Sequence, residues 1–310
     1  MDWAVLMMAY GGPDTLEDVE PYLLDVRGGR ETPPALVEKI RARYAQIGGR
    51  SPLLEITCAQ AAALEEALNQ SSKDRFKTFV GMRHWTPYIH QAVRQIKASG
   101  FTHIVGLCMA PYYSKMSIGA YQEKLGIALK ENALDEVVDL HLVESWHDHP
   151  LFIQTIAEKA RAAVQRFSFE ERENLQFLFT AHSLPAAIME QGDPYADQLA
   201  ETARLVAQAL DLPADRWQLC YQSAGAQNLR WLGPELEAVL DDLAAVGRKS
   251  VLVVPIGFVA DHVEILYDID IEAQETAQSL GIHLERSESM NASPEFIQAL
   301  AAIVYSAVKQ

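Results

Sequence analysis

The sequence predicts an α/β protein built from two similar doubly wound lobes, each with a four-stranded parallel sheet flanked by helices. Short apolar runs rich in β-branched residues alternate with helical patterns along the whole chain, which is typical of right-handed β-α-β units. The alternation stops at a polar connector over residues 168–174 and then starts again. In such folds ligands bind outside the carboxyl ends of the strands, so we expect an active-site cleft between the two lobes.

Residues 1–168 form the predicted first lobe, residues 169–290 the second, and residues 291–310 a closing helix that we expect to pack on the first lobe. In the first lobe we expect strands over residues 4–10, 78–82, 103–110 and 137–143, and helices over residues 16–26, 33–47, 53–69, 89–98, 118–130 and 151–166. In the second lobe we expect strands over residues 175–180, 218–222, 251–254 and 282–284, and helices over residues 195–210, 234–246 and 261–280.

Composition narrows the class of protein. The 310 residues carry a formal net charge of −16, which argues against a nucleic-acid surface. Three cysteines, Cys58, Cys108 and Cys220, lie far apart without a CxxC pair, so a thiolate metal site is not indicated and a reducing compartment fits. The amino-terminal stretch lacks the basic region of a signal peptide, and no apolar run approaches the ~20 residues of a membrane span. We expect a soluble cytoplasmic protein without a transmembrane segment.

An acidic segment follows the strand at residues 251–254. At about 100° per residue, one face of the expected helix carries four carboxylates, and the opposite face carries an apolar stripe. The acidic face comprises Asp261, Glu264, Asp268 and Glu272, with Glu275 beside it, and the stripe comprises Leu266, Ile269, Ala273, Ala277 and Leu280. No Lys or Arg occurs between residues 250 and 285, so a bound cation is one interpretation of the row. An ordinary solvated helix face is the other.

His182 directly follows an apolar strand. An imidazole accepts a proton near neutral pH or binds a transition metal, although a structural histidine is an equal alternative. Ser183 beside it lacks the G-x-S-x-G context of a nucleophile elbow. A histidine together with several carboxylates suits divalent iron, zinc or magnesium.

The first half of the chain also carries a group of arginines. Guanidinium groups can bind carboxylates through two hydrogen bonds, and an unspecific surface cluster is the alternative. These arginines are Arg27, Arg30, Arg41, Arg43 and Arg50. The paired glycines at residues 11–12 and 48–49 match neither G-x-G-x-x-G nor a phosphate-binding loop, so nucleotide binding is not supported.

With these residues collected, the chain resembles the ferrochelatases, which insert ferrous iron into a porphyrin. The resemblance covers nearly the whole length and is carried by residues 44–53 (YAQIGGRSPL), 180–185 (TAHSLP), 192–195 (GDPY), 231–234 (WLGP) and 257–268 (GFVADHVEILYD). It implies a two-lobed, chelatase-like fold. It also implies that His182 and Glu264 face each other across the porphyrin cleft, with Glu264 as proton acceptor and His182 delivering or binding iron or taking pyrrole protons.

The resemblance further implies that Asp268 and Glu272 form a metal route or an outer metal site, which could hold Mg²⁺. Fe²⁺ would be a substrate, and no redox cofactor would be required because the iron does not change oxidation state. We expect a monomer that binds a porphyrin and Fe²⁺ and passes its product to a downstream coproheme decarboxylase.

Tyr10 points to a subtype. A tyrosine at this position resembles the bacterial coproporphyrin III ferrochelatases, in which it can approach the iron axially. In that group the propionates are held by residues that match Arg27, Arg43, Ser51 and Tyr121; Gly28 departs from relatives that carry a further basic residue. Coproporphyrin III would thus become coproheme. Alternatives are a protoporphyrin IX ferrochelatase, a cobalt or nickel chelatase, and a haem-binding carrier or sensor on the same fold.

Overall fold

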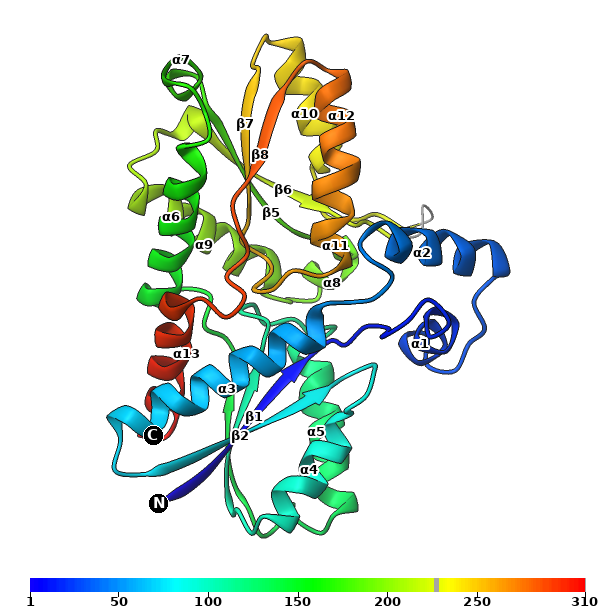
Figure 1. Ribbon diagram of the computed structural model, residues 1–310, viewed down its shortest axis with the longest axis vertical. Coiled ribbons are helices and arrows are strands. Elements are labelled where there is room, and N and C mark those ends of the chain that lie inside the picture. Colours follow the sequence, from blue (N-terminus) through cyan, green and yellow to red (C-terminus); the bar gives the residue numbers. More distant parts are fainter. Residues whose placement is uncertain (226–228, 310) are drawn as a thin grey trace. The chain divides into compact units, whose positions relative to one another are not determined.

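The computed structural model in Figure 1 describes residues 1–225 and 229–309. The chain forms two compact units. Unit 1 comprises Met1–Trp146 together with Asn291–Gln310, of which Gln310 lies outside the described residues, and unit 2 comprises His147–Met290. Each unit contains one four-stranded parallel sheet flanked by helices, which confirms the predicted fold class.

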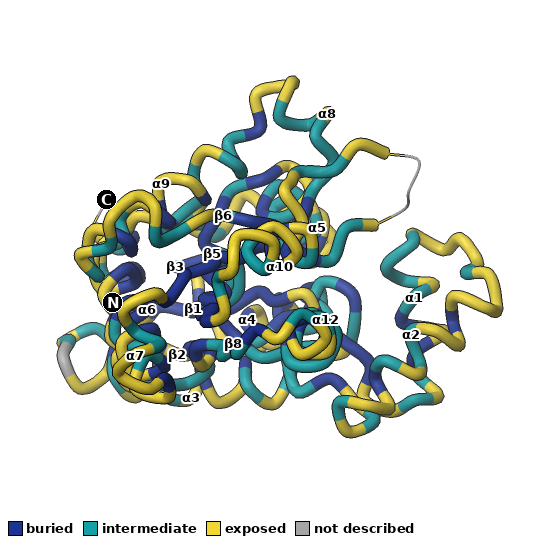
Figure 2. The backbone as a smooth tube through the Cα atoms, turned by 90° about the horizontal axis from the view of Figure 1, so that it is seen from above, coloured by how far each residue is buried: buried dark blue, intermediate teal, exposed yellow. Residues whose placement is uncertain are grey.

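The sheet of unit 1 has the strand order β2-β1-β3-β4. Its strands are β1 (Asp2–Ala9), β2 (Arg75–Met82), β3 (His103–Cys108) and β4 (Asp139–Val143). Met8 of β1 pairs with Gly81 of β2 on one side and with Cys108 of β3 on the other, so these three strands end at the same edge of the sheet. Figure 2 shows β1 and β3 buried along almost their full length, as expected of parallel strands covered on both faces.

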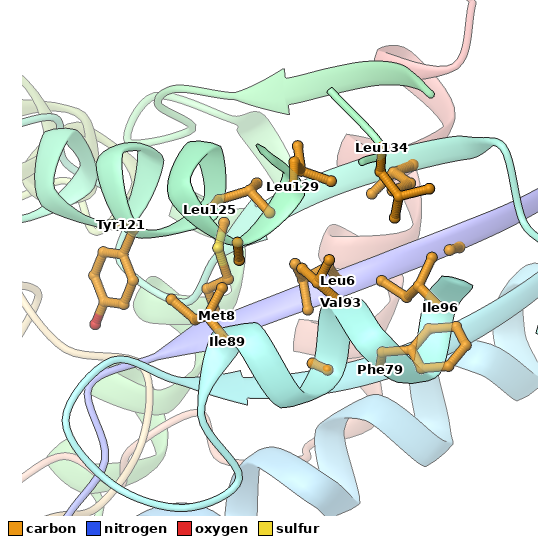
Figure 3. Packing of buried hydrophobic residues seen from close by; sticks show 14 of the residues in the cluster. Leu6, Met8, Phe79, Ile89, Val93, Ile96, Tyr121, Leu125, Leu129 and Leu134 are labelled. Carbon is orange, nitrogen blue, oxygen red and sulfur yellow. The ribbon is translucent and has the colours of Figure 1, made fainter. Parts of the chain in front are cut away.

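Six longer helices among the described residues of unit 1 accompany this sheet. They are α1 (Val19–Val26), α2 (Pro34–Gln46), α3 (Leu53–Ser71), α4 (Ile89–Ala98), α5 (Ile118–Glu131) and α13 (Pro294–Ala307). Leu6 and Met8 pack with α4 and α5 in one apolar cluster, which Figure 3 shows around β1. The carboxy-terminal helix α13 belongs to this unit: the Tyr305 hydroxyl donates a hydrogen bond to the Leu68 carbonyl of α3 (2.6 Å), and its ring lies edge-on to Phe76 of β2 at 5.9 Å.

The sheet of unit 2 has the strand order β6-β5-β7-β8, which repeats the order of unit 1. The strands are β5 (Gln176–His182), β6 (Trp217–Gln222), β7 (Ser250–Pro255) and β8 (His283–Arg286). The helices are α6 (Pro150–Val164), α7 (Phe169–Glu173), α8 (Ala186–Met189), α9 (Tyr195–Ala209), α10 (Leu236–Ala245), α11 (Val263–Leu266) and α12 (Gln274–Ser279), with a 3₁₀ turn, η1 (Ala214–Arg216).

The boundary between the units lies earlier than the sequence analysis expected. The predicted first lobe ended at residue 168, whereas unit 1 ends at Trp146 and helix α6 belongs to unit 2. Lys159 of α6 forms an ion pair with Glu288 (3.6 Å), and Arg161 donates to the Ala209 carbonyl at the end of α9. The polar connector over residues 168–174 therefore contains the short helix α7 within unit 2 and is not the point where the chain passes from unit 1 to unit 2.

The acidic segment is not one continuous α-helix. It forms the single turn α11, the π-helical segment η2 (Asp268–Ala273) and then α12. The amide of Glu272 donates to the carbonyl of Tyr267, five residues earlier (2.9 Å), and this wider turn shifts every following side chain around the axis. Of the two interpretations of the acidic row, the ordinary solvated face is therefore wrong for Asp268, which is only 5% exposed. The buried stripe begins at Ile265 rather than at Leu266.

Among the residues that the structure describes, no helix is both long and apolar enough to cross a membrane.

We predict that Leu6→Ala lowers the free energy of unfolding by about 2–5 kcal/mol, because it opens a cavity in the fully buried cluster between β1, α4 and α5. Urea denaturation followed by circular dichroism measures the change. Ile127→Ala on the half-exposed face of α5 is the control and should stay within about 0.5 kcal/mol of the parent. Equal losses in the two variants would contradict the assigned core.

Candidate active site

His182 and Glu264 lie side by side in unit 2. His182 ends β5, and Glu264 lies in α11, which follows the neighbouring strand β7. The His182 Nε2 and Glu264 Oε1 atoms are 3.5 Å apart, and each side chain is about one-third exposed (31% and 32%). The two groups are therefore within direct reach of each other, and their placement across the porphyrin cleft stays a prediction.

Backbone contacts determine how the His182 ring is presented. Its Nδ1 lies at the carbonyl of Ser183, which can only accept a hydrogen bond, so Nδ1 carries a proton. An unprotonated Nε2 would then direct its lone pair at the carboxylate of Glu264. The contact thus places a ring nitrogen and a carboxylate oxygen, both of which can bind a cation, side by side. The Tyr195 hydroxyl donates a hydrogen bond to the His182 carbonyl (2.9 Å) and so anchors the end of β5.

His262 is a third member of this site, and the sequence analysis did not assign it a role. Its Nε2 lies 3.4 Å from Glu264 Oε2, and its Nδ1 donates to the Ala260 carbonyl (2.9 Å). Burial opposes protonation of this ring, but the hydrogen bond and charge of Glu264 outweigh burial and raise the pKa of His262. Glu264 thus lies between two imidazoles. The signal was present in the sequence as a histidine two residues before the carboxylate.

The end of β6 supports the same helix turn. The buried Gln222 donates from Nε2 to the backbone carbonyl of Glu264 (2.6 Å). The backbone carbonyl of Gln222 accepts a hydrogen bond from the Ser183 amide (2.8 Å). The Ser183 hydroxyl donates to the Leu232 carbonyl (2.7 Å). Ser183 is fully buried with its hydroxyl engaged, so it supports the backbone and is not a nucleophile.

The outer carboxylates are placed differently from one another. Asp268 is buried and accepts a hydrogen bond from the Ser223 hydroxyl, whereas Glu272 is half-buried, and its charge helps to raise the pKa of Glu237 after the larger effect of burial. Asp261 lies before α11, and its carboxylate is 3.5 Å from the guanidinium of Arg286. Arg286 is the first residue after the stretch without basic residues. Within residues 1–225 and 229–309, no three His, Cys, Asp or Glu side chains form a group that could hold a metal ion.

Unit 1 brings Tyr10 and Tyr121 together around one arginine. Tyr10 directly follows β1 and is 40% exposed. The guanidinium of Arg83 lies over its ring at 5.8 Å and over the ring of Tyr121 at 5.5 Å. Figure 3 shows Tyr121 at the end of the apolar cluster, and burial raises its pKa well above the ordinary value. Arg83 was missed because no local motif marks it: the amide of Arg83 pairs with the Ala9 carbonyl (2.8 Å) only in the folded sheet.

His84, which pairs with Asp25, packs against the ring of Tyr10. The ring of His84 lies against that of Tyr10 at 4.7 Å, and its Nδ1 is 2.7 Å from Asp25 Oδ1. Burial lowers the pKa of His84 to about 4 despite the hydrogen bond to Asp25, and the charges of Arg83 and Lys124 act in the same direction as burial. His84 is therefore neutral at physiological pH.

The other predicted substrate-binding residues come from α1, α2 and the loop before α3. Ser51 is 8% exposed, and its amide donates to the Pro13 carbonyl (2.9 Å). A side chain at Gly12 would place Cβ only 2.5 Å from Ser51 Oγ, so the glycine permits this close approach. Arg43 lies in the last turn of α2. Arg27 directly follows α1, and its buried Nε has no hydrogen-bond partner among the described residues. Arg27 makes no hydrogen bond there to Tyr10 or Ser51.

Comparison with solved structures shows which class of fold this is. SirB from Bacillus subtilis, solved with Fe³⁺, superposes with a TM-score of 0.61 at 13% identity, covering 99% of this chain and 96% of that one. The sirohydrochlorin chelatase SirB from Bacillus subtilis subspecies spizizenii, in complex with cobalt, gives 0.58 at 11% identity, covering 100% and 96%. The fold is that of the chelatases.

Sequence comparison narrows the class to one family. The family model described as Ferrochelatase matches residues 2–308. A ferrochelatase of Deinococcus radiodurans is 44% identical over 300 residues, covering 97% of this chain and 94% of the relative. A coproporphyrin III ferrochelatase of Geobacillus sp. (strain WCH70) is 40% identical over 307 residues, covering 98% and 97%. The chain belongs to the ferrochelatase family, as its sequence motifs predicted.

We predict that His84 stays neutral down to about pH 4 in the folded protein. Its lowered pKa means that the unfolded chain, with a pKa near 6.5, binds the proton first. The associated stability is complete above about pH 6.5 and is lost as the pH falls through about 4, on the order of 3 kcal/mol in all. NMR titration of the ring measures the pKa, and a value near 6.5 would contradict it. His84→Gln should reduce the loss of stability between pH 7 and pH 4.

Proposed function

We propose that this member of the ferrochelatase family inserts ferrous iron into coproporphyrin III and releases coproheme. Ferrochelatases as a family insert iron into a porphyrin, and relatives at about 40% identity carry both the general name and the coproporphyrin III name. The observation that carries the proposal is the Glu264 carboxylate held between two imidazoles, because this is where pyrrole protons can be received.

Metallation replaces two pyrrole protons by one divalent ion. The groups that receive those protons must be basic near neutral pH and must lie within hydrogen-bond reach. We assign Glu264 as the proton acceptor, and His182 as the residue that takes pyrrole protons or presents the incoming iron. His262 would hold the second oxygen of Glu264 and so direct the first toward His182. All three act from unit 2.

Tyr10 and the basic residues of unit 1 support the choice of porphyrin. Coproporphyrin III carries more propionates than protoporphyrin IX and needs more cationic or hydroxyl partners. Arg27 offers a buried Nε that no described residue uses, which fits a guanidinium that binds a carboxylate. Arg43, Ser51 and Tyr121 complete the proposed set. Tyr10 would approach the iron.

Iron is a substrate in this proposal, and its oxidation state does not change, so the reaction itself needs no redox cofactor. We propose Asp268 and Glu272 as the path by which Fe²⁺, or an accompanying Mg²⁺, approaches Glu264. Asp268 would bind the ion from a buried position, where the Ser223 hydroxyl holds its carboxylate. Glu272 would bind it from a half-buried position. A monomer that passes coproheme to a decarboxylase completes the proposal.

We predict that His182→Ala and Glu264→Gln each lower kcat for iron insertion by at least about 100-fold while porphyrin still binds. Anaerobic assays with Fe²⁺ and coproporphyrin III measure turnover, and quenching of intrinsic fluorescence measures binding. His283→Ala and Glu171→Gln are matched controls, since they remove another imidazole–carboxylate pair of unit 2 (2.6 Å). Full activity in either site variant would contradict the assigned roles.

We further predict that kcat/KM for coproporphyrin III exceeds that for protoporphyrin IX by about tenfold or more, because one lost ionic contact costs roughly that much. The same assay with the two porphyrins measures the ratio. A preference for protoporphyrin IX would overturn the substrate and leave the family intact. Stoichiometric binding of porphyrin or haem without turnover would instead favour a haem carrier or sensor.

A further inference from the structure

The short helix that carries Glu264 cannot hold its own orientation. Helix α11 contains four residues, and the π-helical segment η2 follows directly. A single helical turn is not stable alone, because the first turns fix several dihedral angles for few hydrogen bonds. A π-helical turn is likewise uncommon and depends on its surroundings. The direction of the Glu264 side chain therefore depends on contacts from elsewhere in unit 2.

One such contact comes from Arg286 and reaches both sides of Glu264. Its Nε and Nη2 donate to the two carboxylate oxygens of Asp270 (2.6 and 2.8 Å), six residues after Glu264. Its Nη1 lies 3.5 Å from Asp261, three residues before Glu264. The Arg286 side chain is 14% exposed, so solvent screens these ion pairs only weakly.

The same guanidinium is itself held firmly. Nη1 donates to the Ser287 carbonyl (3.1 Å) and to the Ser289 hydroxyl (3.3 Å), and that hydroxyl donates to Asp261 (2.6 Å). Arg286 pairs with Val253 of β7, the strand that leads into the Glu264 segment. Both flanks of the short helix are thus tied to the sheet through one side chain.

We propose that Arg286 is a positioning residue for iron insertion: its guanidinium fixes the backbone before and after Glu264 and so keeps that carboxylate within reach of His182. This inference rests on the proposed role of Glu264. The planar fork of arginine is essential because it donates to both oxygens of Asp270 at once, which a lysine cannot reproduce. A displacement of about 1 Å at a reacting group can reduce a rate about 100-fold.

Two conservative variants test the inference. Arg286→Lys keeps the charge and removes the two-point contact, and Asp270→Asn keeps the shape and removes the partner's charge. Each should lower kcat for iron insertion by about 10- to 100-fold, the usual effect of losing a group that orients a functional residue. The KM for porphyrin should change by less than about threefold, because the porphyrin itself is not contacted.

Arg216→Lys is the matched control. Arg216 also lies in unit 2 and donates to the carbonyls of Leu175 (3.1 Å) and Glu173, but it touches neither Asp261 nor Asp270 among the described residues. Its kcat should equal that of the parent. Activities are expressed per porphyrin-binding site and measured well below each melting temperature, so that a loss of folded protein does not count as a loss of rate.

The outcomes separate the possible failures. Unchanged kcat in Arg286→Lys and Asp270→Asn, with a lowered melting temperature, would mean that the cluster only stabilises the fold and would overturn the inference. If Arg286→Lys does not fold, Asp270→Asn decides alone. If the parent inserts no iron, or if Glu264→Gln keeps full activity, the proposed function fails first, independently of Arg286.

Discussion

The site in unit 2 depends on one repeated interaction, the donation of an imidazole Nδ1–H to a backbone carbonyl. It occurs at His182 with Ser183 and at His262 with Ala260. Each contact fixes the tautomer and rotation of a ring, so that Nε2 of each faces an oxygen of Glu264. The carboxylate is thereby held between two bases whose orientation is determined by the main chain. Strand ends, helix α11 and the supporting hydrogen bonds all serve to maintain that alignment.

The two sheets share a strand order but differ in chemistry. In each sheet a proposed site residue lies at the end of one of the two central strands: Tyr10 follows β1, and His182 is the last residue of β5. In unit 1 the neighbouring side chain is a cation, Arg83, and in unit 2 it is the anion Glu264. The same strand order can therefore carry a cationic group that favours carboxylates in unit 1 and a carboxylate that favours protons and metal ions in unit 2.

Sequence reasoning predicted the fold and singled out His182 and Glu264, which lie 3.5 Å apart in the structure, because both are local signals. Alternating β and α patterns identify parallel sheets, and His182 and Glu264 stand near strand ends in recognisable motifs. It did not recover the π-helical turn, whose hydrogen bond from Glu272 to Tyr267 departs from the assumed period. It also missed Arg286, which lies one residue beyond the stretch without basic residues and reaches Asp270 only because β8 pairs with β7. The boundary at residue 146 was missed because helix α6 looks the same in either unit.

The wide turn at η2 has a consequence for how this segment can change over time. Ile265 lies before it and Ala277 after it, and both are fully buried in the same core. On a regular α-helix, at about 100° per residue, the twelve residues that separate them would place the two side chains about 120° apart around the axis. The wide turn absorbs one residue and so brings both side chains onto the same face. Removing one residue from Asp268–Ala273 would therefore leave a regular helix with Ala277 still in the core, so the wide turn can be gained or lost together with one residue.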